Sequence, residues 1–388
     1  MKENQEYMGN NLWPKRLFTL DVSRGFAALA VVLTHWSLFA FDGGLHLSED
    51  YNIANLPLYA VLKIFYEYGY LAVAYFFLVS GFIFFWLYRS SIENKDISFG
   101  IFWIQRISRL YPLHFVTLLI VALLQTVYIS QNGNSFIIQY NDMYHFFLNL
   151  GFVSNWGFES SYSFNSPVWS VSIEIFAYFV FFMVAYNRQG GALFCLGISV
   201  MSVAIIPLTN NVLLFKGMAA FFLGGFVFYL TLYISTRLQK LKAVIYIIAA
   251  FSWLLTIVDL YVFNLVSDFI LGFGGIGKVF LMGFPYSILF PFTLCSLALI
   301  GIDNGQCLKP ISWIGDITYS SYLLHFPLML VFALALSYGR LNSDFYLNSA
   351  YLVVFFLILI PLSYITFIGF ERPMQNIIRN QCKHDVKV

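Results

Sequence analysis

Charged residues are what this chain of 388 residues has least of. Only 10% of the residues are Asp, Glu, Lys or Arg, whereas 60% are hydrophobic and 20% are aromatic. A chain with so few charges and so many apolar residues cannot hide its apolar surface in one soluble core, which excludes an ordinary soluble domain. The net charge of +2 excludes a strongly basic surface for nucleic acid. The composition therefore predicts an all-α, polytopic membrane protein.

Cysteine is also scarce. The four cysteines form no CxxC pair and no cluster with histidine, which argues against a zinc or haem site and against a disulfide framework. We therefore expect no metal and interpret the cysteines as packing residues. They are Cys195, Cys295, Cys307 and Cys382.

Ten apolar runs of about 17 to 25 residues are long enough to cross a membrane as helices. The first run is too long for a signal-peptide core and has no convincing cleavage site, so we expect it to be retained. The fold is predicted as about ten transmembrane helices around a buried polar channel, with a cytoplasmic head (1–16), one membrane domain (17–370) and a cytoplasmic tail (371–388). The runs cover residues 17–41, 69–88, 113–129, 168–186, 192–208, 213–234, 243–263, 279–302, 319–338 and 350–370.

Lys and Arg are distributed unevenly between these runs. With the N-terminus inside, sixteen of the twenty Lys and Arg residues other than Arg24 fall on the cytoplasmic side. The positive-inside rule then places both termini in the cytoplasm. Loop 130–167 holds neither Lys nor Arg, so it is expected on the extracytoplasmic side, with a short helix at 143–152.

The first run contains three ionisable residues in LDVSRGFAALAVVLTHW: Asp21, Arg24 and His35. At 100° per residue they share one helix face, with Arg24 roughly 16 Å from His35 along the axis. A charge at membrane depth costs about 2.5 kcal/mol or more unless it faces a bundle interior or a wet cavity, so this face is expected to line a polar interior. The alternative is a boundary pair, Asp21 and Arg24, with His35 as a hydrogen-bonded core residue.

Arg106 and Arg109 are spaced i and i+3 in FGIFWIQRISRL, residues 99–110. This segment is predicted as a cytoplasmic interfacial helix that ends at Pro112. A lipid-headgroup anchor is the ordinary role of such a pair. The functional alternative is a phosphate clamp, because guanidinium groups bind phosphate oxygens through two hydrogen bonds.

Glu174, in SPVWSVSIEIFAYF, is an intramembrane carboxylate on the outer side, which structure alone rarely explains. Ser80 and Gly81 are small residues in the middle of the second run, where close helix packing is the favoured interpretation.

His325 precedes Pro327 by two residues in the ninth run. A proline there frees a backbone carbonyl three or four residues earlier, and a histidine or serine side chain can satisfy such a group. Structural and functional roles for His325 both stay open. At the end of the tenth run we interpret Glu371 and Arg372 as an ion pair at the cytoplasmic boundary.

Five stretches together resemble the acyltransferase-3 family, multi-span membrane enzymes that O-acylate surface polysaccharides and other extracytoplasmic acceptors. LDVSRGFAALAVVLTHW is similar to the leading family motif, in which an arginine precedes a histidine by eleven positions. FFLVSGF, QRISRLYPLH, PVWSVSIE and YSSYLLHFPL are similar to later motifs, in the family order. The chain departs from the pattern at LDVSRG, where Gly-Leu is commoner before the arginine, and at Met374 after the E-x-P; neither departure removes a titratable residue.

The resemblance implies that His35 is catalytic, that Arg24 helps to hold acyl-CoA, and that Arg106, Arg109 and Glu174 belong to the same active region. It also implies an O-acyltransferase of the bacterial inner membrane. Such an enzyme moves an acyl group, usually acetyl or succinyl, from cytoplasmic acyl-CoA to a hydroxyl of an extracytoplasmic carbohydrate or cell-surface glycan.

The residues and the resemblance favour one mechanism. Donor phosphates meet the arginines at the inner side, and the thioester arm lies along the first run toward His35, which removes the hydroxyl proton. Direct transfer is favoured over an acyl-histidine intermediate. The expected site comprises catalytic His35, Glu174 and Asp21, donor-binding Arg24, Arg106 and Arg109, and substrate-binding Trp169, Ser172, Ser80 and His325.

A transporter or flippase is the alternative from another class, because intramembrane Asp, Arg, Glu and His can also form a proton relay. No inverted repeat is visible, and the arginines gather on the side where CoA arrives, which favours the enzyme. A purely structural or regulatory partner of a polysaccharide synthase would leave the buried charges unexplained.

Overall fold

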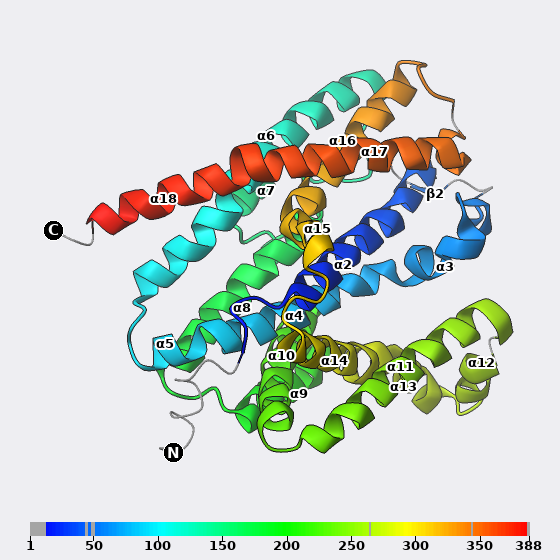
Figure 1. The fold of residues 1–388 in the computed structure, drawn as a ribbon. Helices are drawn as coiled ribbons and strands as arrows, with labels where there is room; N and C mark the ends of the chain where they lie inside the picture. The colour runs from blue at the N-terminus through cyan, green and yellow to red at the C-terminus, as the bar shows by residue number, and fades with distance from the viewer. Residues whose placement is uncertain (1–12, 43–45, 48–50, 264, 343, 386–388) are drawn as a thin grey trace.

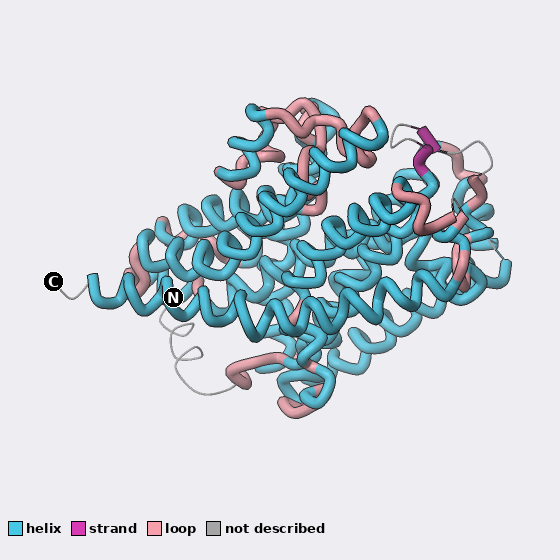
Figure 2. The backbone as a smooth tube through the Cα atoms, turned by 90° about the horizontal axis from the view of Figure 1, so that it is seen from above, coloured by secondary structure: helices cyan, strands magenta, loops and turns pink. Residues whose placement is uncertain are grey.

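Helices form nearly all of the structure. The computed structural model of the chain describes residues 13–42, 46–47, 51–263, 265–342 and 344–385 (Figure 1). Two short antiparallel strands, β1 (Phe41–Asp42) and β2 (His46–Leu47), pair at one edge of the helical body (Figure 2). The predicted all-α, polytopic membrane fold is confirmed.

The first half of the chain contributes seven of the described helices and the second half ten. The former are α2 (Phe18–Trp36), α3 (Tyr59–Tyr68), α4 (Ala72–Leu87), α5 (Arg89–Glu93), α6 (Phe99–Asn132), α7 (Met143–Leu150) and α8 (Val168–Tyr186). The latter are α9 (Ala192–Ile205), α10 (Val212–Thr236), α11 (Lys242–Val258), α12 (Leu265–Leu271), α13 (Gly275–Phe284), α14 (Phe290–Asp303), α15 (Trp313–Asp316), α16 (Thr318–Ser337), α17 (Ser349–Thr366) and α18 (Arg372–Asp385).

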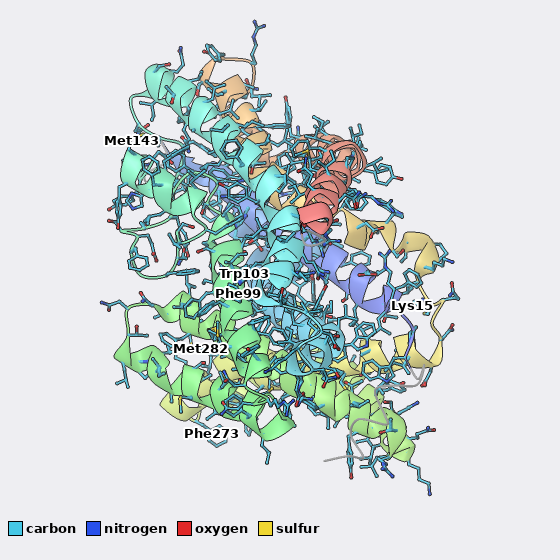
Figure 3. All side chains as sticks on the ribbon, turned by 90° about the vertical axis from the view of Figure 1, so that its left-hand side faces the viewer. Lys15, Phe99, Trp103, Met143, Phe273 and Met282 are labelled. Carbon is cyan, nitrogen blue, oxygen red and sulfur yellow. The ribbon has the colours of Figure 1, made fainter. Side chains whose placement is uncertain are left out.

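Nine helical segments of the described residues are long and apolar enough to cross a membrane. The fifth expected run, 192–208, is helical throughout but is shorter than these nine. Large apolar side chains cover the outer surface, as contact with lipid requires: Val279 is 72% exposed and Leu193 is 83% exposed. Figure 3 labels Met143, Phe273 and Met282 among these surface side chains.

Helices α4 and α10 pack with their backbones in direct contact. A Cβ atom at Gly81 would lie 1.8 Å from the Phe221 carbonyl oxygen, and one at Gly224 would lie 1.9 Å from the Leu78 carbonyl oxygen. Only glycine permits this approach, so the predicted small-residue packing at Gly81 is confirmed. The contact fixes the position of α4, which carries the neighbouring Ser80.

Helix α6 corrects the prediction that an interfacial helix ends at Pro112. The helix runs without interruption from Phe99 to Asn132, with Pro112 inside it. Proline is tolerated in a membrane helix where neighbouring helices hold the backbone in place. Helices α16 and α18 pack along α6, and the Tyr319 hydroxyl donates to the Leu110 carbonyl (2.5 Å). Arg106 and Arg109 therefore lie on the same rigid helix as the span that follows them.

The segment expected as a cytoplasmic tail is helical where the structure describes it. A π-helical turn, Phe367–Glu371, joins α17 to α18. Arg379 anchors α18 to α6 by donating to the Gln105 carbonyl (2.9 Å) and to the Ser108 hydroxyl (3.2 Å). Figure 1 shows α18 leaving the body on the side of α5, opposite β2 and α12.

Helix α2 lies among α3, α4, α14, α15 and α16. Its backbone approaches α15 so closely that a Cβ atom at Gly25 would lie 2.4 Å from the Ile314 side chain. The loop that follows α6 carries the expected short helix as α7, Met143–Leu150. Because α2 carries Asp21, Arg24 and His35, its central place brings all three into contact with other helices rather than lipid.

Candidate active site

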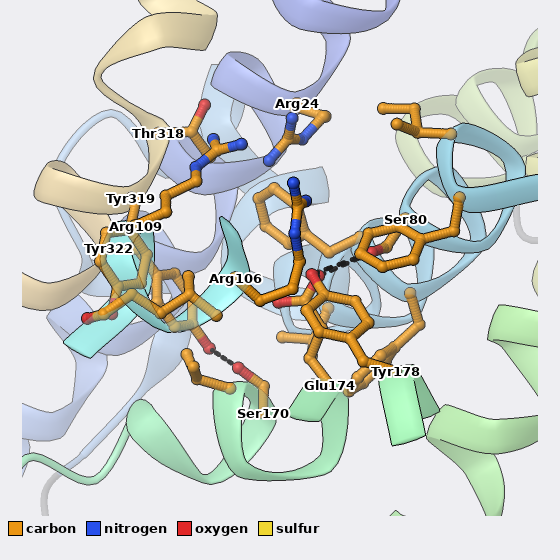
Figure 4. Close-up of a pocket in the computed structure, with 17 residues that line it drawn as sticks. Arg24, Ser80, Arg106, Arg109, Ser170, Glu174, Tyr178, Thr318, Tyr319 and Tyr322 are labelled. Atoms are coloured by element: carbon orange, nitrogen blue, oxygen red, sulfur yellow. Dashed lines mark hydrogen bonds between the residues drawn. The ribbon is translucent and has the colours of Figure 1, made fainter. Parts of the chain in front are cut away.

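Two adjoining cavities open between α2, α6 and their neighbours. The first, which we call the polar cavity, has a volume of about 250 Å³ and is lined by Arg16, Asp21, Arg24, Arg109, Gly315, Asp316, Phe367, Glu371 and Gln375. The second, the inner cavity, has a volume of about 100 Å³. Its polar lining residues are Arg24, Ser80, Arg106, Arg109, Ser170, Glu174, Tyr178, Thr318, Tyr319 and Tyr322 (Figure 4). Arg24 and Arg109 line both cavities and mark their junction.

Arg24 and Arg109 reach this junction from α2 and α6. Neither guanidinium makes a hydrogen bond or an ion pair with any residue that the structure describes. The two cations repel each other, and Asp21 and Glu174 attract Arg24 from beyond ion-pair distance. Two such cations facing one space form a ready site for an anion, because guanidinium groups offer several donors in a fixed plane.

Arg106 joins them but is already engaged. Its Nη2 donates to the Tyr88 hydroxyl at 2.5 Å. Its guanidinium lies over the rings of Phe84 and Tyr88, with distances of 5.2 and 4.7 Å to the ring centroids. These aromatic contacts hold the side chain at the edge of the inner cavity. The structure thus brings together all three arginines that the sequence selected (Figure 4).

Glu174 faces the arginines across the inner cavity from α8. Its Oε1 accepts hydrogen bonds from the Ser80 hydroxyl (2.6 Å) and from the Tyr178 hydroxyl (2.5 Å). The intramembrane carboxylate is therefore hydrogen-bonded at the cavity wall. No hydrogen bond joins it to His35 among the described residues.

Ser170 and Tyr322 form a second polar contact in the inner cavity, with their hydroxyl oxygens 2.8 Å apart. Sequence reasoning missed both, and it missed Tyr178. A signal existed for the pair on α8, because Ser170 and Glu174 are four residues apart and so share one helix face. Tyr322 lies one turn before His325, and the centroids of their rings are 5.9 Å apart. This tyrosine connects the inner cavity to the histidines beyond it.

His35 and His325 contact each other through their imidazole rings. Nδ1 of His35 lies 2.8 Å from Nε2 of His325, and the stacked rings have centroids 5.0 Å apart. His325 has no exposed surface. Neither histidine lines the polar cavity or the inner cavity.

The backbone carbonyl that Pro327 deprives of its helical partner belongs to Leu323. Asn165 satisfies it, with its side-chain amide donating at 3.0 Å. The sequence allowed a histidine or serine side chain in this role; the structure uses Asn165 instead, which comes from a loop far away in the chain. His325 is thereby left to pair with His35.

Asp21 lies at the polar cavity, in an ion-pair cluster. Arg16 donates to Asp21 (Nε to Oδ2, 2.5 Å) and to Asp316 (Nη2 to Oδ1, 2.6 Å). The cluster ties the start of α2 to α15. Asp21 therefore lies on the same helix as His35 without contacting it, and it lines the polar cavity only.

Glu371 also lines the polar cavity, although it was interpreted as the partner of Arg372. That interpretation is wrong: Glu371 is 4% exposed and accepts a hydrogen bond from the Ser320 hydroxyl (2.6 Å), whereas Arg372 is exposed. The π-helical turn at the end of α17 rotates Glu371 inward. Local sequence gave no signal for that rotation.

Trp169 and Ser172 line neither cavity. The Ser172 hydroxyl donates to the Phe152 carbonyl (2.8 Å) and accepts from the Asn155 backbone N–H (3.1 Å). Trp169 packs against Phe77 with ring centroids 6.5 Å apart. Of the four residues expected to bind substrate, Ser80 alone lines a cavity, while His325 lies beyond it.

Comparison with known proteins finds similarity to acyltransferases. A family model described as an acyltransferase domain matches residues 17–368. Acyltransferase MdmB of Streptomyces mycarofaciens is 33% identical over 174 residues, which make up 44% of this chain and 40% of that relative. The chain thus spans less than half the length of this curated relative. No solved structure matches it.

Proposed function

This chain belongs to the acyltransferase-3 family, and on that premise we propose that it moves an acyl group, acetyl in the simplest case, from cytoplasmic acyl-CoA to a hydroxyl of an extracytoplasmic carbohydrate or cell-surface glycan. The family makes the protein an acyltransferase with a multi-pass membrane domain. The donor, the acceptor and the orientation are our proposal. It rests above all on Arg24 and Arg109, two cations at the junction of two cavities that form no ion pair with a described residue.

Arg24, Arg109 and Arg106 are proposed to hold the donor phosphates. A phosphate oxygen pair accepts two hydrogen bonds from one guanidinium, and each charge-assisted bond is stronger than a neutral one. The inner cavity continues from this junction between aromatic rings and the hydroxyls of Ser80 and Tyr322. That lining suits an extended thioester arm, because its methylene groups can pack against the rings while its amide and hydroxyl groups hydrogen-bond to the side-chain hydroxyls.

His35 is proposed as the general base. An alcohol is a poor nucleophile until a base removes its proton in the transition state, and such catalysis contributes about 10² to 10⁴-fold. Nε2 of His35 makes no hydrogen bond to a described residue, and the His35 side chain is only partly buried. Glu174 is proposed to hold substrate hydroxyl or amide groups beside Ser80, since it has no contact with the imidazole.

The proposal is tested on purified protein in lipid nanodiscs with radiolabelled acetyl-CoA and a panel of oligosaccharides. We expect label to move to a carbohydrate hydroxyl and free CoA to appear in equal amount. Incubation without an acceptor distinguishes direct transfer from an acyl-histidine intermediate. Stoichiometric label on the peptide that contains His35 would contradict direct transfer. Absence of label transfer to any acceptor, together with unchanged surface glycans in cells that lack the gene, would contradict the function.

The proposed orientation is tested by single cysteines in a chain whose native cysteines are replaced by alanine. Gln131 and Gln239 are both exposed, at opposite ends of the helical bundle. We expect an impermeant thiol reagent to label Gln131→Cys in intact cells and to label Gln239→Cys only after the membrane is opened. The reverse pattern would place the arginines on the wrong side for cytoplasmic acyl-CoA.

A further inference from the structure

We propose that His325 is a positioning residue for His35: it holds His35 in the tautomer whose Nε2 carries a free electron pair, and it shares the proton that His35 takes up. The inference rests on the proposed function of His35 as general base. It replaces the expectation that His325 binds substrate, because His325 lines neither cavity and its Nε2 faces His35.

The distance between the rings allows one hydrogen between them. At 2.8 Å, Nδ1 of His35 and Nε2 of His325 form a hydrogen bond, in which one nitrogen donates and the other accepts. If His35 donates, its Nε2 has a free electron pair and can remove a proton. If His325 donates, His35 carries its hydrogen on Nε2 and cannot act as a base. The direction of this one bond therefore decides whether His35 is competent.

The surroundings of His325 favour the competent direction. The backbone carbonyl oxygens of Ser321 and Tyr322, in the preceding turn of α16, lie near the imidazole of His325, whose Nδ1 is buried. The contact lies outside ordinary hydrogen-bond geometry, but carbonyl oxygens attract an N–H and repel a nitrogen electron pair. A hydrogen on Nδ1 leaves Nε2 of His325 as the acceptor, so His35 must donate.

The residues around the pair hold both rings in place. On α2 the neighbours of His35 are fixed on both sides, because Thr34 donates to the Phe65 carbonyl (2.6 Å) and Trp36 donates to the Tyr346 carbonyl (2.8 Å). On α16 the amide of Asn165 holds the backbone at Leu323, as described above. The titratable side chain of Tyr322 packs beside His325, with ring centroids 5.9 Å apart. No described carboxylate forms a hydrogen bond or an ion pair with either ring.

The chemical step balances without another reactant. The acceptor oxygen attacks the thioester carbonyl carbon while its proton moves to Nε2 of His35. The Nδ1–H of the resulting imidazolium is then held by, or passed to, Nε2 of His325, so that the positive charge belongs to the pair. The C–S bond breaks, the departing CoA thiolate takes the proton back, and both histidines return to their neutral forms.

The tautomer is measured directly by ¹⁵N NMR of histidine-labelled protein in lipid. The chain has six histidines, and the His35→Gln variant assigns the signal of His35. We expect the wild-type His35 signal to be that of an Nδ1–H imidazole, and we expect the Nε2–H form to appear in His325→Leu. An Nε2–H signal for His35 in the wild type would overturn the inference, whether or not transfer has been observed.

Kinetics give an independent readout. Leucine fills the space of His325 but cannot accept a hydrogen bond, whereas the carbonyl oxygen of glutamine can accept one from His35. We expect His325→Leu to lower kcat about 100-fold with KM for both substrates unchanged, and His325→Gln to restore part of the loss. Wild-type CoA affinity and unfolding midpoint in both variants would show that they fold.

The outcomes separate the two claims. Full kcat in His325→Leu beside an inactive His35→Ala would contradict the positioning role and leave the proposed function intact. Equal losses in the leucine and glutamine variants would also contradict the positioning role, because only a structural defect predicts them. No transfer by the wild type would contradict the proposed function, and the ¹⁵N signal would still decide the tautomer.

Discussion

Two histidines of this protein bind their partners through the same ring nitrogen, and only one of them is free to react. Nδ1 of His35 lies 2.8 Å from His325 inside the helical bundle. Nδ1 of His145 lies 2.8 Å from Oδ2 of Asp142 at the start of α7. The difference is at Nε2. In His145 this atom accepts the Ser160 backbone N–H at 3.2 Å, whereas in His35 it makes no hydrogen bond to a described residue.

The role of each of these histidines therefore depends on whether its second ring nitrogen is free, rather than on the partner of its first. A histidine–carboxylate pair looks more like a catalytic arrangement than a histidine–histidine pair does. Yet the hydrogen bond from Ser160 fixes the hydrogen of neutral His145 on Nδ1 and leaves that ring no free electron pair. We therefore interpret Asp142 and His145 as a fastening of the loop, and His35 as the reactive residue.

The largest expected effect is on kcat, when His35 or His145 is replaced. His35→Ala and His35→Gln should both reduce kcat by about 10² to 10⁴-fold, because neither side chain can take up a proton. His145→Gln, the matched control, should keep kcat within a few-fold. Initial rates of acetyl transfer and CoA affinity would be measured for all three. A fully active His35→Gln, or an inactive His145→Gln that still folds, would reverse the assignment.

The second effect is on CoA binding, which we expect to depend on Arg24, whereas proton removal depends on His35 of the same helix. Arg24→Lys keeps the charge but loses the planar pair of donors, so Kd for CoA should rise about 10-fold; Arg24→Ala should raise it about 100-fold. Exposed Arg340→Lys is the control. Titration of CoA by calorimetry checks the order. If both Arg24 variants bind CoA normally, Arg24 has a structural role and the anion site is not at the cavity junction.

The third effect is on the free energy of unfolding, through the close packing of α4 against α10 beside the site. Gly81→Ala places a Cβ atom 1.8 Å from a backbone oxygen of α10, and we expect a loss of about 3 kcal/mol in the free energy of unfolding, since overpacking against backbone cannot relax locally. Gly100→Ala is the control, because no atom lies within 4 Å of its Cβ position. Unfolding midpoints in detergent measure both. Equal midpoints would mean that α4 and α10 approach less closely than the structure shows.

The sequence predicted well whatever depends on local hydropathy. The run 168–186 became α8 with the same ends, and the loop helix expected at 143–152 became α7 (Met143–Leu150). Prediction failed at Pro112, because proline's local preference to end a helix was overcome by packing along α6. The hydropathy of a segment is read from its own residues, whereas such packing depends on partners elsewhere in the chain.

Several of the residues predicted for the site come together in the structure, but their pairings were not predicted. All three arginines and Glu174 meet at one cavity, as expected of charges that cannot face lipid. The contact of His35 with His325 spans 290 positions, and no periodicity within one helix reveals which other helix will face it. Ser172 was chosen and Ser170 missed, although Ser170 shares the helix face of Glu174.

The smallest effect lies at the fastening of α7. Asp142 accepts the backbone N–H of His145 (2.9 Å). This bond, with the imidazole contact, lowers the pKa of the Asp142 carboxyl below its ordinary value of 3.8. A carboxyl whose pKa is lowered by folding contributes stability that is present above the unfolded-state pKa and is lost as the pH falls through the folded-state value. The fastening should therefore hold at neutral pH and weaken only below about pH 4.

Asp142→Ala should remove this pH dependence and lower the local stability of α7 by about 0.5 to 1 kcal/mol, the low end for a lost N-cap, because the Asp142 side chain is half exposed. Asp142→Asn should cost less, since asparagine also caps helices well. Hydrogen exchange at the amides of α7, measured at pH 7 and at about pH 3, reports the change, with the amides of α8 as reference. If exchange in α7 is the same in the wild type and in Asp142→Ala at pH 7, the pair of Asp142 and His145 does not fasten the loop. The structural role that we assign to His145, in contrast to His35, would then be wrong.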